Sequence, residues 1–166
     1  MKRCAALFAL ACIAAMPALA VDSVVLGRGV SNDFFAEIEC SPTDLCMDSF
    51  YIWELDAKQT LAGPKVTGRV RAVIAVHTSA TSKYVKSVEL FVLRPVENFE
   101  ANDSKSPAFN LVALSRRYAG GKYCLDVDPL SVGLEVESTR STNGLFCFRR
   151  ADVLRPNKSL ERTRDR

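Results

Sequence analysis

Alternation of apolar and polar residues with a period of two recurs along this chain of 166 residues and predicts β-strands. The clearest run is 66–77, where positions 70, 72, 74 and 76 are apolar and Arg69, Arg71 and His77 lie on the opposite face. The other expected strands cover residues 22–30, 34–40, 50–61, 85–94, 109–117, 123–128, 132–137 and 145–149.

Turn-forming residues separate several of these strands. They include Gly63-Pro64, Asp128-Pro129 and Asn143-Gly144, and residues 96–108 form the clearest loop. Residues 50–61 also fit a helical spacing, with Ser49 and Gly63 as its ends. We favour a strand there, because 50–53 is aromatic and β-branched. Phe50 and Trp53 are expected in the core rather than in an exposed binding patch.

These strands and turns predict an all-β fold, a small closed or partly open barrel of the OB-like kind stapled by disulfides. A β-sandwich is the alternative. The run Asp22-Ser23-Val24-Val25-Leu26-Gly27-Arg28-Gly29-Val30, followed by strands at 51–61, 66–77 and 89–93, resembles secreted OB-fold domains of the netrin and metalloproteinase-inhibitor type over residues 22–127. In that inhibitor family the mature amino-terminal cysteine chelates the target's metal. Here the expected mature start is Val21-Asp22, so no functional residue carries over.

Residues 1–20 have the pattern of a secretory signal peptide. Lys2 and Arg3 precede an uncharged apolar run, and Ala18-Leu19-Ala20 suits cleavage after Ala20. A retained anchor is disfavoured by Pro17 and by the short run, and lipidation of Cys12 by a poor lipobox. We therefore expect a secreted or periplasmic protein without a membrane span after signal removal. Residues 21–150 would form a single β domain and 151–166 a disordered polar tail.

The charge distribution argues against a nucleic-acid partner. The whole chain carries +3, whereas residues 21–148 hold 13 basic and 16 acidic side chains, a net charge of −3. Affinity for nucleic acid comes from neutralising phosphates with a basic surface on the folded domain. The basic character of this chain lies at its ends instead.

Four cysteines remain after signal removal, and an even number in an exported chain favours disulfides. They allow three connectivities, of which we favour Cys40 with Cys46 and Cys124 with Cys147. A metal site is disfavoured, because no Cys-x-x-Cys occurs and the chain has a single histidine.

Catalytic signals are weak. His77 is the only imidazole, and it lacks a partner at a recognisable spacing. Acidic pairs at Glu37 and Glu39, Asp126 and Asp128, and Glu135 and Glu137 suit calcium or acid-base chemistry, but also any solvated strand face. The Gly27-Arg28-Gly29 and Gly120-Gly121-Lys122 runs lack the rest of a phosphate loop and indicate backbone flexibility. No cofactor is predicted.

The leading hypothesis is an exported non-enzymatic binding module that presents loops, first 95–108 and Thr78–Lys83, to a protein or a glycan in the envelope or outside the cell. One alternative is a small periplasmic or secreted hydrolase using His77. Another is an accessory structural subunit of an envelope assembly that pairs through a strand edge.

Overall fold

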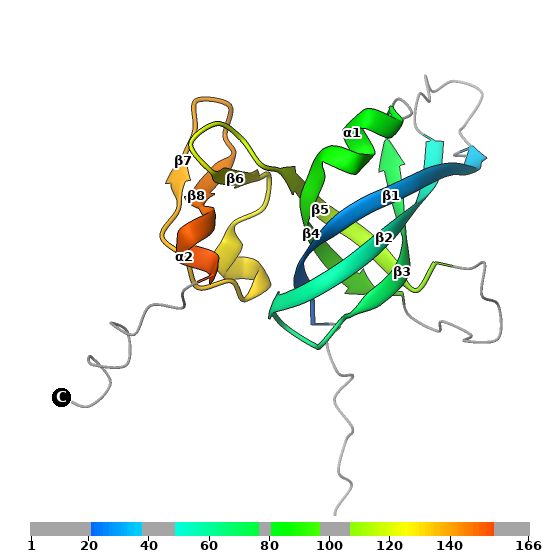
Figure 1. The fold of residues 1–166 in the computed structure, drawn as a ribbon, viewed down its shortest axis with the longest axis horizontal. Coiled ribbons are helices and arrows are strands. Elements are labelled where there is room, and N and C mark those ends of the chain that lie inside the picture. The colour runs from blue at the N-terminus through cyan, green and yellow to red at the C-terminus, as the bar shows by residue number, and fades with distance from the viewer. Residues whose placement is uncertain (1–20, 38–48, 77–80, 97–106, 155–166) are drawn as a thin grey trace, which may run out of the picture.

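Figure 1 shows two groups of elements side by side. One is a ring of five strands, and the other is a three-stranded sheet. The computed structural model describes residues 21–37, 49–76, 81–96 and 107–154. The ring is made of β1 (Ser23–Glu37), β2 (Ser49–Ala62), β3 (Gly68–Val76), β4 (Val88–Pro95) and β5 (Phe109–Arg116). The smaller sheet contains β6 (Lys122–Leu125), β7 (Thr139–Arg140) and β8 (Phe146–Arg149).

The five strands close into a barrel in the order β1-β2-β3-β5-β4, and β4 returns to pair with the start of β1. Every neighbouring pair is antiparallel except β3 with β5, which run parallel. This confirms the all-β fold and the small OB-like barrel predicted from the sequence, rather than the sandwich.

β1 and β2 are long strands that extend together toward one end of the barrel. The sequence predicts two strands, at 22–30 and 34–40, where the structure has the continuous β1. The polar stretch between them stays paired with β2. The register shifts between Gly29 and Ser31 and between Phe34 and Ala36, but the strand continues through both shifts. The strand expected at 50–61 is confirmed, and it buries Trp53 inside the barrel.

A short helix, α1 (Ser82–Ser87), lies where the sequence predicts the end of a polar loop and the start of the strand at 85. The side chain of Thr81 caps it by accepting a hydrogen bond from the backbone N–H of Tyr84, and Val85 is buried. Gly29 on β1 leaves no room for a Cβ against the carbonyl of Val85. This glycine therefore permits close packing of α1 on β1, and the interpretation of Gly27-Arg28-Gly29 as flexibility is corrected.

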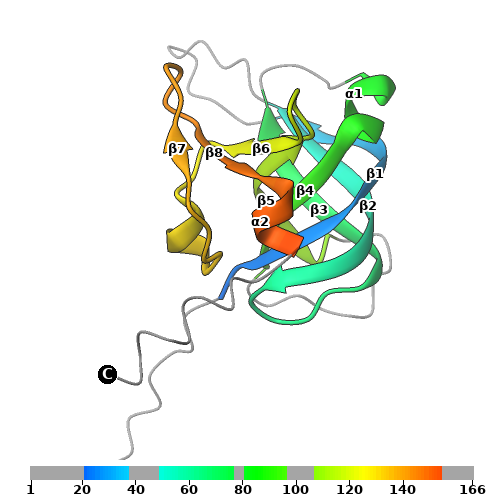
Figure 2. The ribbon, with the colours of Figure 1, turned by 60° about the vertical axis from the view of Figure 1, so that its left-hand side comes forward.

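The smaller sheet has the order β6-β8-β7, and a disulfide joins β6 to β8. Cys124 on β6 lies directly opposite Cys147 on β8, and the two cysteines form a disulfide, as the sequence favours. Figure 2 shows these C-terminal elements against the β4 and β5 side of the barrel. Cys40 and Cys46 lie outside the described residues.

The prediction of a strand at 132–137 is wrong. A 3₁₀-helix, η1 (Pro129–Val132), begins after Asp128, whose carboxylate accepts a hydrogen bond from the backbone N–H of Leu130. Residues 133–138, between η1 and β7, join no sheet. The apolar alternation still reports burial, because Val132 and Leu134 are buried while their neighbours are exposed.

Two hydrophobic clusters hold the molecule together. The first fills the barrel around Trp53, Leu55 and Phe91. The second joins the outside of β1, β4 and β5 to the smaller sheet through Tyr123, Leu125 and Phe148. A last helix, α2 (Arg150–Leu154), buries Val153 in this second cluster, so residues 151–154 belong to the fold and not to the predicted tail. Within the described ranges no helix is long and apolar enough to cross a membrane.

Candidate functional site

Several residues singled out by the sequence lie outside the described residues. They are His77, the loop residues 78–80, the centre of the 95–108 loop at 97–106, Glu39, Cys40 and Cys46. The site is therefore built from the remaining surface.

The acidic pairs that can be placed do not form a metal centre. Asp128 caps η1, while Glu135 and Glu137 are exposed to solvent. In residues 21–37, 49–76, 81–96 and 107–154, no three His, Cys, Asp or Glu side chains are grouped closely enough to hold a metal ion. The carboxylate of Asp128 has a structural role.

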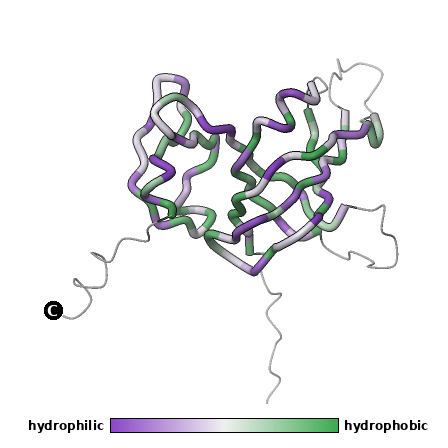
Figure 3. The backbone as a smooth tube through the Cα atoms, in the orientation of Figure 1, coloured by the Kyte–Doolittle hydropathy of each residue, from purple (hydrophilic) through white to green (hydrophobic). Residues whose placement is uncertain are grey.

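A pocket of about 480 Å³ opens where the barrel meets the smaller sheet. One wall comes from the junction of α1 and β4, the other from the end of β5 and the turn toward β6, which Figure 3 shows as a hydrophilic stretch. Its volume falls in the range of small-molecule sites, about 300–1,000 Å³. We call it the arginine pocket, and it is lined by Ser87, Glu89, Arg116, Arg117, Tyr118 and Ala119.

The two arginines of this pocket lack carboxylate partners in the described part of the chain. Arg116 stacks over the ring of Tyr118, with its guanidinium carbon 5.1 Å from the ring centroid, and Arg117 makes no ion pair there. Other arginines are neutralised, at N···O distances of 2.8 to 3.0 Å: Arg69 by Glu54, Arg94 by Asp22 and Arg149 by Asp152. Among the described residues, the lining of the arginine pocket thus holds more positive than negative charge.

Glu89 is the single acidic residue lining the arginine pocket, and a buried tyrosine holds it. Tyr123, fully buried, donates its hydroxyl hydrogen to Glu89 Oε2 at 3.0 Å. Burial raises the pKa of Tyr123 to about 12, and the hydrogen bond and negative charge of Glu89 act in the same direction. Tyr123 therefore stays protonated, and the second oxygen of Glu89 is left as an acceptor.

Tyr84 of α1 extends this cluster of side chains. Burial and the proximity of Tyr118 raise the pKa of Tyr84, whereas the positive charge of Arg116 acts against that shift. Its ring also meets the buried Trp53 edge-on, with centroids 6.3 Å apart. Two tyrosines and a guanidinium are therefore neighbours at this edge of the barrel.

A buried serine holds in place the wall of the arginine pocket that contains Arg116 and Arg117. Ser115 donates its hydroxyl hydrogen to the carbonyl of Arg116 at 2.9 Å and accepts a hydrogen bond from the backbone N–H of Cys124 at 2.9 Å. The intervening turn is tight, because Gly120 and Gly121 both adopt positive φ, which favours glycine. The wall is thereby tied through β6 and its disulfide to the smaller sheet.

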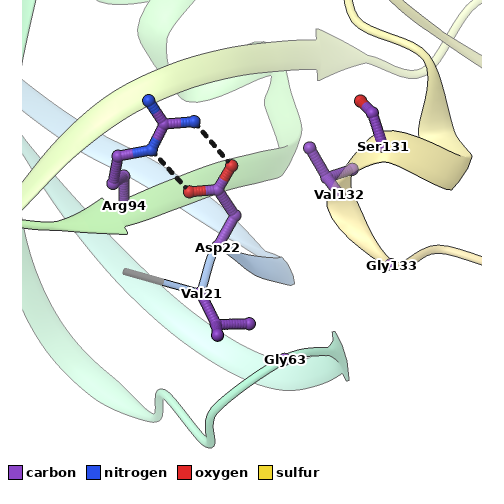
Figure 4. A pocket seen from close by; sticks show the side chains of 7 residues that line it. All are labelled: Val21, Asp22, Gly63, Arg94, Ser131, Val132 and Gly133. Atoms are coloured by element: carbon purple, nitrogen blue, oxygen red, sulfur yellow. Dashed lines mark hydrogen bonds and ion pairs between the residues drawn. The ribbon is translucent and has the colours of Figure 1, made fainter. Parts of the chain in front are cut away.

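A second, smaller pocket of about 280 Å³ lies at the start of β1. Figure 4 shows Asp22 and Arg94 in a two-point ion pair, with Nε–Oδ1 and Nη2–Oδ2 distances of 2.8 and 2.9 Å, facing η1 residues Ser131 and Val132. The charges of Asp22 and Arg94 already neutralise each other. It is a weaker candidate for binding a charged ligand than the arginine pocket.

An exposed aromatic surface marks the far end of β1. Phe34 and Phe35 are 58% and 54% exposed, although Phe34 also meets the ring of Tyr51 edge-on at 5.8 Å. Large exposed apolar side chains mark a contact surface where they form a contiguous patch. Within the described residues, nothing identifies what covers them.

The sequence reasoning missed the arginine pocket. A signal was available in Arg116-Arg117-Tyr118, a basic pair and an aromatic residue placed between a strand and a Gly-Gly turn. That signal is short, and the opposite wall at Ser87 and Glu89 is nearly thirty positions away.

Comparison with known proteins adds no family: no family model, curated protein or solved structure matches the chain. The OB-like class therefore rests on the strand order alone, and the resemblance to netrin and metalloproteinase-inhibitor domains stays a prediction.

Proposed function

We propose that this chain is an exported, non-enzymatic binding module that recognises an oxyanion group in the arginine pocket. The observation that carries the proposal is the pair of guanidinium groups, Arg116 and Arg117, which line one pocket and lack carboxylate partners among the described residues. Guanidinium groups bind carboxylate and phosphate oxygens through charge-assisted, often two-point hydrogen bonds. The partner, a protein or a glycan, offers such a group.

The scaffold supports this function by holding the pocket rigid. Its two walls come from the barrel and from the turn that Ser115 and the disulfide fix in place. A preformed site loses less conformational entropy when its ligand binds. Recognition groups at the ends and turns of a stiff frame are the usual arrangement in binding modules.

Two features support export. β1 begins at Ser23 and Asp22 is bound to Arg94, so cleavage after Ala20 leaves the folded strand intact. The Cys124–Cys147 bond suits an oxidising compartment. Mass spectrometry of the protein recovered from its native cells is expected to find a mature chain that starts at Val21. A protein recovered with Met1 intact and with free thiols at Cys124 and Cys147 would contradict export.

The binding function is tested by isothermal titration of the purified protein with acetate, inorganic phosphate and galacturonate. We expect saturable one-to-one binding of at least one of them, and a loss of about tenfold or more in affinity in Arg116→Ala and Arg117→Ala, the usual effect of a charge-assisted hydrogen bond. Arg149→Ala is the matched control, because that arginine is exposed and paired outside the pocket. No saturable binding of any of the three anions would refute the proposal.

A further inference from the structure

The charges of the arginine pocket also restrict the charge of the ligand that it can bind. Two arginines and one glutamate line the pocket, so the lining residues carry a net charge of +1. A single carboxylate group on the ligand is matched by this lining. A doubly charged phosphate carries more negative charge than this lining offsets.

Glu89 adds a second requirement. Its Oε2 accepts the hydroxyl of Tyr123, whereas no hydrogen bond to Oε1 occurs within the described part of the chain. A carboxylate oxygen that lines a pocket and lacks a partner is a site for a hydroxyl or ammonium donor. The ligand that satisfies both walls therefore carries an anion at one end and a donor at the other.

The remaining lining groups suit a polar ligand body. Tyr118 is 40% exposed, and Ser87 is held by donating its hydroxyl hydrogen to the carbonyl of Tyr84 at 2.6 Å. These groups offer oxygen atoms and an aromatic edge beside Ala119 rather than an apolar slot. An extended hydrocarbon chain would find no apolar wall here.

From these features, and resting on the proposed function, we infer that the arginine pocket takes a small polar monocarboxylate, with its carboxylate on Arg116 and Arg117 and a hydroxyl or ammonium donor on Glu89. Acidic sugars and free amino acids share this chemistry. Acetate has the carboxylate without the donor, and galactose has hydroxyl donors without the carboxylate.

The test is a calorimetric comparison of galacturonate, serine, acetate and galactose on the purified protein, in which the galacturonate and serine arms distinguish the two sources. We expect galacturonate or serine to bind at least about tenfold more tightly than acetate, since the extra hydrogen bond involves a charged group. Galactose is expected to show no saturable binding.

Glu89→Gln tests the role of the carboxylate, because glutamine keeps an oxygen that can accept the Tyr123 hydroxyl. The variant is expected to lose the preference over acetate, because the carboxylate that accepts the donor is gone, and to bind acetate no more weakly than the wild type does, because a negative charge has left the pocket. Equal binding of acetate by the wild type, or an unchanged preference in Glu89→Gln, would overturn the inference and leave the oxyanion function standing. If no anion binds, the proposed function fails instead.

Discussion

The hydroxyl of Tyr123 on β6 donates a hydrogen bond to Glu89 on β4 across 3.0 Å, and so joins the smaller sheet to the barrel. The ring of Tyr123 packs in the cluster between the two parts, 6.2 Å from the ring of Phe148. One buried residue therefore contributes both to the core and to the orientation of a side chain in the arginine pocket. This link makes the pocket sensitive to changes that act on the fold.

The first prediction concerns alkaline pH. The pKa of Tyr123 is raised from 10.0 in the unfolded chain to about 12 in the folded protein, with burial as the main cause. Between these values the unfolded chain releases the proton while the folded protein keeps it. The stability that Tyr123 contributes is therefore complete below pH 10 and is lost as the pH rises to 12.

Urea unfolding at several pH values in this window measures that effect. We expect the decline to be smaller in Tyr123→Phe, which has no proton to lose. Tyr118→Phe, at an exposed position, is the control and is expected to follow the wild type. An identical decline in wild type and Tyr123→Phe would contradict the assignment.

The second prediction concerns Ser115, which is 2% exposed. Ser115→Ala leaves the backbone N–H of Cys124 without its partner, and should lower the free energy of unfolding by about 1–3 kcal/mol. It should also weaken anion binding, because the carbonyl of Arg116 is released. Ser131→Ala removes an exposed serine hydroxyl and is expected to change neither quantity by much. Wild-type stability and affinity in Ser115→Ala would show that this clamp is unimportant.

The third prediction concerns the disulfide. The bond joins residues 23 positions apart, and replacing both Cys124 and Cys147 by alanine should cost about 2–4 kcal/mol of stability. Thermal unfolding of the double variant is compared with that of the wild type, with and without reducing agent. Reductant should lower the melting temperature of the wild type more than that of the double variant, which keeps Cys40 and Cys46. A wild type unaffected by complete reduction would be evidence against a stabilising role.

The fourth prediction concerns the packing of α1. Gly29→Ala places a methyl group against the carbonyl of Val85, so α1 must move away from β1, at a cost of about 1–3 kcal/mol. Because Ser87 ends that helix, anion affinity should fall as well. Gly68→Ala is the control: it strains a positive φ in open space and should lower stability without changing affinity. Wild-type anion affinity in Gly29→Ala would mean that the position of α1 does not determine the shape of the arginine pocket.

Much of the fold could be predicted from the period-two pattern, because a half-buried strand needs that pattern. The pattern failed at residues 132–137, where the apolar side chains are buried without a sheet, since Pro129 and the Asp128 cap start a 3₁₀-helix just before them. It also failed at α1. That helix is six residues long, and its position depends on contact with Gly29, which no local pattern reports.

The candidate site was harder to predict, because it depends on strand register. Val88 on β4 pairs with Arg116 on β5, and this pairing brings Ser87 and Glu89 beside the arginines. The residues of each wall can be found in the sequence, but the pairing of β4 with β5 that brings the two walls together cannot. It did favour the Cys124–Cys147 bond, because both cysteines lie in predicted carboxyl-terminal strands, and these strands pair directly as β6 and β8.

The most direct test of oxyanion recognition in the arginine pocket is backbone amide chemical-shift mapping during titration with galacturonate. The account predicts saturable shifts concentrated at residues 87–89 and 116–119, which are abolished in the Arg116→Ala, Arg117→Ala double variant. Shifts concentrated around Asp22 and Arg94, or no saturable shifts at residues 116–119 with galacturonate, acetate or phosphate, would contradict it.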